Sequence, residues 1–494
     1  MPIQQTIEFE NTYANELEGF FVPWQGDSAP NSSIIQLNVP LANELGLDPI
    51  DLDSPAGANF LAGSEMPSGA SPLAQVYAGH QFGGFSQQLG DGRALLVGEV
   101  IDRNGHRRDI QLKGSGRTPF SRGGDGKAVL GPVLREYLLG EAMHGLGIPT
   151  TRALAAVTTG EQIAREGGLQ PGAVLARTAS SHIRVGTFQF FAARGETEKL
   201  HQLAEYTIRR HFKDIEKQED RFLDLLRKVI DRQAALVAKW MSVGFVHGVM
   251  NTDNMTISGE TIDYGPCAFI DHYDPNAVFS SIDVHGRYSY SNQPNIAQWN
   301  LARFAETLIP LIDPQDSDNA IRLATIDINT FPVIYQKYWL AEMRSKLGLV
   351  KSEEEDLALI NELHRLIEGQ NIDFTLLFRN LTQTISGNAN PLHNMFDDSS
   401  VIKNWQDKWL TRLNHENQDL ANSTELMNKH NPVYIPRNHK VEEALRAAVV
   451  ETDYEPFKKL QKVLDNPFKQ RDGLEDYEGP APDEFGKYET FCGT

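Results

Sequence analysis

Cysteine is nearly absent from this chain of 494 residues, which contains only Cys267 and Cys492. Two cysteines exclude a disulfide framework and a cysteine-rich zinc site. No uninterrupted apolar run reaches the length of a membrane span, so no transmembrane helix and no membrane partner are expected. The first ten residues lack the basic and apolar segments of a signal peptide and the arginine-rich character of a transit peptide, so we expect a cytoplasmic protein.

Basic residues are outnumbered, because 46 Lys and Arg stand against 66 Asp and Glu and give a formal net charge of −20. A basic face supplies most of the affinity for nucleic acids and anionic membranes, so neither is an expected partner. A local basic pocket remains compatible with this charge. The chain is too long for one ordinary hydrophobic core, and two or three lobes are expected.

Polar side chains concentrate after a helix predicted at 222–241. The loop that follows contains His247 and Asn254, and Asp263 comes directly before an aromatic residue and a glycine. Asn254 and Asp263 offer two hard oxygen ligands, and Mg²⁺ bound to nucleotide phosphates is usually held by few protein ligands of this kind. The order His, Asn, Asp-aromatic-Gly is that of the protein-kinase catalytic loop and its metal loop. The alternative is a turn rich in Asn and Asp without chemistry.

The usual catalytic base of a kinase is missing from this loop. When His247 is aligned with the kinase pattern H-R-D-x-x-x-x-N, Val249 falls at the position of the catalytic Asp. Valine cannot accept a proton, so the metal ligands are kept while the base is lost. Either the chain is an inactive kinase, or it uses the same phosphate clamp for different chemistry. Asp253, next to Asn254, is a spare carboxylate that is available as a base.

Glycines and cations gather between residues 88 and 127. Residues 88–100 predict a strand, a glycine-rich turn and a strand, in which Gly90 and Gly92 allow close approach to a ligand and Arg93 matches phosphate. Residues 109–113 predict the next strand, which ends at Lys113. The loop at 114–127 is rich in glycine and cations within an acidic protein, which suits polyphosphate. A plain hairpin turn and a flexible solvated loop are the alternatives.

The spacing between Lys113 and an acidic residue on the next helix suggests that the two form a pair. Glu136 follows Lys113 by 23 residues, on a helix predicted to begin at Pro132. A Lys–Glu pair between strand and helix holds the phosphate-binding lysine of kinases. A lone Glu on a helix is otherwise a solvated charge. Two strands are predicted at 153–157 and 174–178 around a turn-rich insert, and Arg177 and Arg184 are cations at the lobe junction unless they pair with surface acids.

The second half of the chain is predicted to be mostly helical. Apolar residues at intervals of three and four predict helices at 189–193, 196–212, 222–241, 296–312, 331–347, 353–367 and 376–385. The expected fold class is therefore α+β, with the two-lobed plan of a protein kinase. The predicted parts are an N-terminal extension (1–80), a mixed β/α N-lobe with the nucleotide-binding elements (81–185), a helical C-lobe with the catalytic and metal loops (186–470) and a C-terminal tail (471–494).

Several of these motifs together are long enough to resemble one family. Residues 113–126 (KGSGRTPFSRGGDG), 247–255 (HGVMNTDNM), 263–266 (DYGP) and 286–294 (GRYSYSNQP) closely resemble the selenoprotein O family. The resemblance covers most of the chain, from about residue 70 onward. It implies a protein-kinase-like fold that binds ATP in a flipped orientation and transfers AMP, rather than phosphate, onto Ser, Thr or Tyr hydroxyls of proteins.

The resemblance also implies roles for individual residues. Asp253 is the proton acceptor, and Asn254 and Asp263 bind the metal, Mg²⁺ or Mn²⁺. The implied nucleotide-binding residues are Gly90, Gly92, Arg93, Lys113, Asp125, Gly126, Glu136, Arg177 and Arg184. Lys113 contacts phosphate and pairs with Glu136, and the two arginines hold the far phosphates.

The two cysteines are a separate question. Residue 489 is Glu, so a Cys-x-x-Cys motif at Cys492 is missing. A resemblance to bacterial members suggests instead a disulfide between Cys267 and Cys492, which would tie the tail over the metal loop. Two free thiols in a reducing cytoplasm are the alternative.

Three other functions remain open at the level of sequence. The chain could transfer UMP from UTP, it could be a catalytically silent ATP-binding pseudokinase scaffold, or it could be a small-molecule phosphotransferase of the aminoglycoside-kinase type. The partners expected under the leading hypothesis are ATP and protein substrates, and a monomer is expected.

Overall fold

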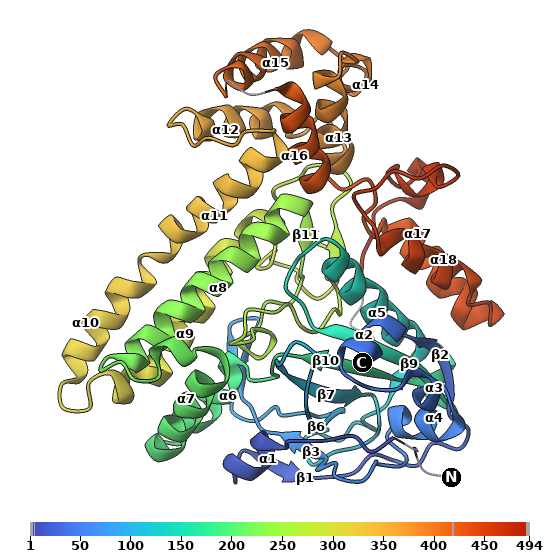
Figure 1. Ribbon diagram of the computed structural model, residues 1–494, viewed down its shortest axis with the longest axis vertical. Helices are drawn as coiled ribbons and strands as arrows, with labels where there is room; N and C mark the ends of the chain where they lie inside the picture. The colour runs from blue at the N-terminus through green and yellow to red at the C-terminus, as the bar shows by residue number, and fades with distance from the viewer. Residues whose placement is uncertain (1–2, 4, 417–418, 491–494) are drawn as a thin grey trace.

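The computed structural model describes residues 3, 5–416 and 419–490. A β-sheet dominates the N-terminal region, and the rest of the described chain is mostly helical (Figure 1). The long helices α8 and α11 run from the level of the sheet toward a group of helices at the far end of the molecule, at the top of the view. The α+β class and the division into a β-containing part and a helical part are therefore present.

The main sheet has eight strands in the order β1-β3-β6-β7-β10-β9-β2, with β8 paired to β10, and all pairings are antiparallel. Its strands are β1 (Phe21–Pro23), β2 (Ser33–Leu37), β3 (Leu73–Gln75), β6 (Ala94–Ile101), β7 (Arg107–Lys113), β8 (Ala128–Val129), β9 (Arg152–Arg165) and β10 (Gly168–Ala179). Strands β1, β2 and β3 precede residue 80, and β2 and β3 pair with the later strands β9 and β6, whereas β1 pairs with β3. The boundary at residue 80 stays a prediction.

Two sequence-based expectations about strands are wrong. Residues 88–93 form no strand, because the backbone N–H groups of Leu89 and Gly90 both bond to the carbonyl of Tyr77 in a loop. The insert at 158–173 is not rich in turns, since β9 and β10 continue through it as one long hairpin. Register shifts in this hairpin, between Pro171 and Ala173 and between Ala176 and Arg177, interrupt the alternation that would have revealed it.

Helix α5 (Leu130–Gly145) covers one face of the sheet. Its apolar side chains, including Val133, Leu134 and Leu138, pack against Ala156 of β9 and Leu175 of β10 in one buried cluster. The helix begins two residues before Pro132, where the sequence predicted its start. This packing fixes α5 on β9 and β10, beside Arg177 of β10, and the Glu136–Lys113 ion pair links α5 to the end of β7.

Most of the remaining chain is helical. Its longer helices are α6 (Val185–Ala192), α7 (Thr197–His211), α8 (Arg221–Val243), α9 (Gln293–Ile312), α10 (Ser317–Ile328), α11 (Phe331–Lys346), α12 (Asp356–Ile367), α13 (Phe374–Ile385), α15 (Ser399–Asn414), α16 (Leu420–His430), α17 (Asn438–Arg446) and α18 (Glu455–Leu464). The seven predicted helices correspond to α6, α7, α8, α9, α11, α12 and α13 and are confirmed. Within the described ranges, no helix combines the length and apolar character needed to cross a membrane.

Short elements connect these two parts around the loop at 245–255. Strands β4 (Gly79–Gln81) and β5 (Gly84–Ser86) form a two-stranded hairpin. Strands β11 (Phe245–Val246) and β12 (Ala268–Phe269) form a second pair, which brackets both the catalytic-type loop and Asp263. These pairs hold the polar loops close to the end of the main sheet.

Candidate active site

A cavity of about 1500 Å³ opens between the sheet, α5 and the loops that follow α8. Every residue that the sequence proposed for nucleotide, metal or base lines it. These residues are Gly90, Gly92, Arg93, Lys113, Asp125, Gly126, Glu136, Arg177, Arg184, Asp253, Asn254 and Asp263. The structure therefore brings them together around one space, although what each of them binds stays a prediction.

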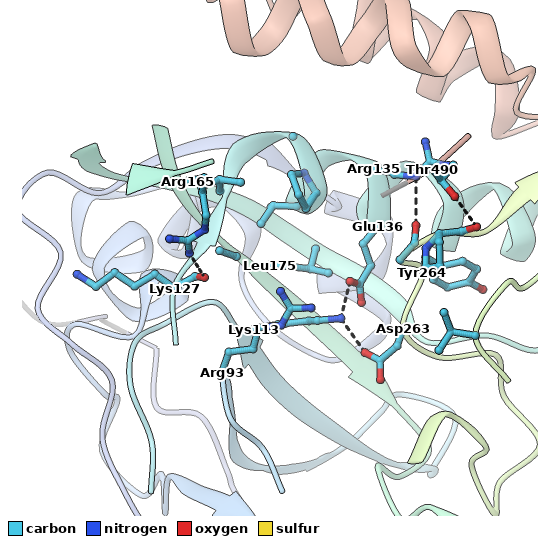
Figure 2. Close-up of a pocket in the computed structure, with 18 of the residues that line it drawn as sticks. Arg93, Lys113, Lys127, Arg135, Glu136, Arg165, Leu175, Asp263, Tyr264 and Thr490 are labelled. Carbon is cyan, nitrogen blue, oxygen red and sulfur yellow. Dashed lines mark hydrogen bonds and ion pairs between the residues drawn. The ribbon is translucent and has the colours of Figure 1, made fainter. Parts of the chain in front are cut away.

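Lys113 lies at the centre of this cavity. The Nζ atom of Lys113 is 2.7 Å from Oε2 of Glu136 and 2.7 Å from Oδ1 of Asp263 (Figure 2). Lys113 ends β7, Glu136 faces it from α5, and Asp263 comes from the loop before β12. The spacing argument predicted the first pair, and the distance between the two side chains agrees with it.

Two arginines approach the same carboxylate. Nη1 of Arg177 lies 2.6 Å from Oδ1 of Asp263 and 2.8 Å from Oε1 of Glu136, and Nη1 of Arg184 lies 2.8 Å from Oδ2 of Asp263. Burial alone would raise the pKa of Asp263, but the charges of Lys113, Arg177 and Arg184 outweigh it and hold the pKa well below its usual range. Asp263 is thus an anion that three cations share.

The backbone around Asp263 is held in an unusual conformation. Its φ is +63°, in the left-handed region that side chains other than glycine rarely adopt. His247 fixes the preceding turn, since its Nε2 lies 2.9 Å from the carbonyl oxygen of Ile262. The hydroxyl of Tyr264 bonds to that of Thr150 at the edge of the sheet. These contacts offset the strain and aim the Asp263 carboxylate at Lys113.

Asp253 is a second, differently placed carboxylate. It lies in a 3₁₀ turn (Thr252–Asn254) and is 7% exposed. Its Oδ2 accepts a long hydrogen bond of 3.3 Å from Nε2 of Gln81, whereas its buried Oδ1 has no hydrogen-bond partner. Burial raises the pKa of Asp253 to about 6. The carboxylate is therefore less acidic than a surface Asp, and one of its oxygens makes no hydrogen bond.

Asn254 is the neighbouring oxygen donor. Its Nδ2 donates a hydrogen bond of 3.0 Å to the carbonyl of Val249, which orients the side-chain amide. The same cavity is lined by the oxygen-bearing side chains of Asn254, Asp253 and Asp263. Within the described part of the chain, no group of three or more His, Cys, Asp or Glu side chains could hold a metal alone. A cation here would need further ligands from phosphate or water.

The glycine-rich segments are packed closely against each other. Gly90 has a φ of +74°, and a Cβ there would lie 2.5 Å from the ring of Phe120. Gly126 has a φ of +69°, and a Cβ there would lie 2.1 Å from the carbonyl oxygen of Gly116. The Asp125 carboxylate pairs with Arg165 at 2.8 Å. A side chain at Gly90 or Gly126 would therefore clash with the neighbouring segment. The carboxylate of Asp125 is engaged in its ion pair with Arg165.

Sequence reasoning missed three residues of this site. The ring of Tyr77 stacks on Arg184, 4.6 Å from its Cζ, and Gln81 bonds to Asp253. Asp91 lies between Gly90 and Gly92, and its buried Oδ1 accepts no hydrogen bond but lies 3.9 Å from Nη2 of Arg184. Burial raises the pKa of Asp91 to about 6 as well. Asp91 lies inside the glycine-rich segment at 88–100, which the sequence had pointed to. Tyr77 and Gln81 lie in no recognisable motif.

The C-terminal segment also reaches the cavity, where Tyr488 and Thr490 line it. The backbone N–H of Thr490 donates to the carbonyl of Phe279 at 2.7 Å, and its hydroxyl donates to that of Pro266 at 2.8 Å. Cys267 is buried next to this contact. Cys492 lies outside the described residues, so its pairing with Cys267 stays a prediction.

Comparisons with known proteins match nearly the whole chain. A family model described as "Protein adenylyltransferase SelO" matches residues 3–465. A protein of Cereibacter sphaeroides, named "Protein nucleotidyltransferase YdiU", is 55% identical over 490 residues, covering 99% of this chain and all of its own. Proteins of the same name from Pseudarthrobacter chlorophenolicus and Rhizobium meliloti are each 51% identical, and each comparison covers 99% of both chains.

Proposed function

Since the chain belongs to the family of protein adenylyltransferase SelO and is a nucleotidyltransferase, we propose that it transfers AMP from ATP to Ser, Thr or Tyr hydroxyls of proteins. One observation carries this proposal. Lys113, Arg177 and Arg184 converge on Asp263 in a cavity that also contains the buried Asp253, while the aliphatic Val249 aligns in sequence with the kinase base. The cations that would bind phosphate are present, and the carboxylate beside them is Asp253 rather than an Asp at position 249.

The proposal includes a kinase-like arrangement of two lobes. The strand–helix pair of Lys113 and Glu136 supports it, because kinases hold their phosphate-binding lysine by the same type of contact. In this proposal, residues 81–185 form the N-lobe and residues 186–470 form the C-lobe. We also expect a cytoplasmic monomer that acts on proteins rather than on nucleic acid, given the net charge of −20.

A divalent metal fits the residues present. The amide oxygen of Asn254 and the carboxylate of Asp263 are hard donors in one cavity, and hard oxygen ligands suit Mg²⁺ or Mn²⁺. When bound, such an ion would neutralise charge on the phosphates. Lys113, Arg177 and Arg184 would also neutralise charge on the phosphates. A bound nucleotide would then supply part of the negative charge that Asp263 supplies to these cations in this structure.

The reaction is a substitution at the α-phosphorus. The acceptor oxygen forms a bond to the α-phosphorus, the bond from that phosphorus to the bridging oxygen of the β-phosphate breaks, and pyrophosphate leaves. Asp253 takes the proton of the acceptor hydroxyl. Negative charge develops on the leaving pyrophosphate, where Lys113, Arg177 and Arg184 stabilise it. This assignment requires ATP in the flipped orientation, with its α-phosphate toward Asp253.

ATP labelled in either the α-phosphate or the γ-phosphate tests the proposal. Label in the α-phosphate should appear on protein in the presence of Mg²⁺ or Mn²⁺, label in the γ-phosphate should not, and intact mass should increase by one AMP residue. Asp253→Ala should abolish the incorporation while nucleotide binding persists. Transfer of the γ-label would identify a kinase, and ATP binding that leads to no transfer would identify a silent scaffold. Consumption of the γ-phosphate only with an added small acceptor would identify a small-molecule phosphotransferase.

Transfer of UMP from UTP is the second candidate. The name of the relatives, protein nucleotidyltransferase, leaves the nucleotide open. The phosphate-facing residues described above contact the part that ATP and UTP share, so they do not discriminate between the two bases. Competition between the two nucleotides at equal concentration, followed by intact-mass analysis, ranks them directly, since AMP and UMP differ in mass.

A further inference from the structure

A group of exposed apolar side chains lies beside Asp253 and takes no part in the site described above. The β4–β5 hairpin presents Phe82 and Phe85, which are 36% and 41% exposed. The segment before Tyr288 presents Ile282 and Val284, which are 53% and 83% exposed. The rings of Phe82 and Tyr288 are 5.1 Å apart, so the hairpin and this segment are neighbours. Grouped exposed apolar residues commonly mark interaction sites.

Both segments are attached to the loop that carries Asp253. The backbone N–H of His80 donates to Oγ1 of Thr252 at 2.7 Å, and that of Phe82 donates to Oδ1 of Asn251 at 3.0 Å. The hydroxyl of Tyr288 donates to the same Oδ1 at 2.7 Å. A molecule that docks on the hairpin would therefore be held within a few residues of the proposed base.

One cation occupies the middle of this surface. The Cζ of Arg287 lies 5.7 Å from the ring centre of Tyr288 and 4.8 Å from that of Trp299. Trp299 contacts His80 at 5.2 Å, and His80 contacts Phe85 at 4.7 Å between ring centres. We name this continuous set the aromatic row, which comprises Phe82, Tyr288, Trp299, His80 and Phe85, with Arg287 between its two halves. Tyr288 is buried and supports Phe82, so the docking face is formed by the other members.

The charge of Arg287 is not neutralised within the described chain. Its Nε is buried without a hydrogen-bond partner, and its guanidinium makes no ion pair with any described carboxylate. Asp283 does not serve this purpose, because its two oxygens accept the backbone N–H groups of Arg287 and Tyr288 at 2.9 and 2.7 Å. Arg303 differs, since it lies over the same Trp299 but pairs with Glu306 at 2.6 Å.

We propose that the aromatic row and Arg287 dock the acceptor segment of the protein substrate. This inference rests on the proposed function. The segment carries an acidic side chain near its acceptor hydroxyl and an apolar side chain that packs on Phe82 and Phe85. An unpaired guanidinium in a chain of charge −20 attracts an anionic side chain, and a planar fork matches a carboxylate. The surface thus selects acidic acceptor segments over basic ones.

A peptide library tests this selection by exchanging the charge. The library has one central Ser with varied residues on both sides, and transfer from α-labelled ATP is scored at each position. The wild-type enzyme should favour Asp or Glu at one position by about 10-fold over Lys. R287E should favour Lys or Arg at that same position, and F82A combined with F85A should reduce the preference for apolar residues. R303Q is the matched control, and it should keep the wild-type selection.

The inference is overturned if no position selects an acidic residue, or if R287E leaves the selection unchanged. It is also overturned if the wild-type enzyme modifies itself or intact proteins but no peptide, because the surface then does not recognise a short segment. Intact mass of the enzyme after incubation with ATP separates this failure from failure of the proposed function. When neither self-modification nor transfer to any acceptor occurs, both proposals fall.

A binding measurement provides a second readout that needs no transfer. A fluorescent acidic peptide with an apolar residue should bind the wild-type protein, and R287E should weaken its binding by about 10-fold or more. A basic peptide of the same length should show the opposite preference. Equal binding of both peptides by the wild-type protein would contradict the inference, as would capture of the acidic peptide by R287E with unchanged affinity.

Discussion

At the scale of single residues, the two carboxylates of the site are prepared for opposite tasks. Asp263 is surrounded by three cations that hold its pKa well below the usual range, so it remains an anion. Asp253 is buried with one oxygen unpartnered, and burial raises its pKa to about 6. Environments that separate the pKa values of two neighbouring acids are a common way to assign different roles to them. Asp263 suits permanent charge, and Asp253 suits proton transfer.

The pH dependence of the reaction follows from Asp253. A base must be deprotonated to act, so kcat/KM should fall as pH drops through about 6, by up to tenfold per pH unit below it. Transfer of α-label measured between pH 5 and 8 checks this. Asp91 titrates in the same range and lines the same cavity, so the D91N variant is needed as a control. The acidic limb should persist in D91N, and its loss there would reassign it to Asp91.

Gln81 should tune that base. Its hydrogen bond to Asp253 favours the charged carboxylate and lowers the pKa, against the larger effect of burial. In Q81L the pKa should rise, and the acidic limb of the kcat/KM profile should move to higher pH. Q88L replaces an exposed glutamine nearby and should leave the limb in place. An unchanged limb in Q81L would show that Gln81 does not act on Asp253.

A site residue can be predicted from the sequence when it lies in a motif or at a fixed spacing from another residue. Lys113, Glu136, Asn254 and Asp263 lie in motifs or at spacings within one stretch of chain. Gln81 reaches Asp253 across 172 residues. No local pattern encodes such a contact, because it depends on how the hairpin docks on the loop. Charge neutralisation around Asp263 was unpredictable for the same reason.

At the scale of elements, apolar periodicity located α5 and seven helices of the second half of the chain, but it missed α10 and α15 to α18 and did not locate all strands. The seven predicted helices show a clear spacing of three and four, and they are present within a few residues of the expected ends. Residues 88–93 resemble a strand in composition, yet tertiary hydrogen bonds to Tyr77 keep them in a loop. The hairpin of β9 and β10 contains register shifts, and a shift by one residue exchanges the two faces of a strand.

The β4–β5 hairpin should be sensitive to the size of one residue. A Cβ at Gly79 would lie 2.3 Å from Oδ1 of Asp253, the proposed base. G79A should therefore displace either β4 or the Asp253 side chain and reduce transfer by about 100-fold, while the protein stays folded. G84A provides the control in the same hairpin, because its nearest neighbour would be 3.5 Å away.

Activity and thermal unfolding of G79A and G84A, measured together, check this prediction. Near-normal activity in G79A would mean that the Asp253 carboxylate can move without loss, and that its position is not set by the hairpin. A loss of activity in G84A equal to that in G79A would point to the hairpin as a whole rather than to the contact at Asp253.

At the scale of the whole molecule, the ion pairs at Asp263 connect its two parts. Lys113 and Arg177 belong to the main sheet, Arg184 precedes the first helix of the helical part, and Asp263 lies between β11 and β12. Breaking a buried ion pair by removing one partner leaves uncompensated charge and is strongly destabilising. The carboxylate therefore stabilises the arrangement of the two parts as well as the cavity.

Removal of that charge gives a test of nucleotide binding that does not depend on catalysis. In D263N, three cations lose their shared anion, so the free energy of unfolding should fall by roughly 3 kcal/mol and Tm with it. A triphosphate restores negative charge to the same cations and binds only the folded state, so ATP with EDTA should raise the Tm of D263N more than that of the wild type. D271N is the matched control, because Asp271 pairs with the buried Arg437 at 2.7 Å outside the cavity. Its loss of stability should not be recovered by ATP, and equal recovery in D271N would mean that the nucleotide does not bind at Asp263.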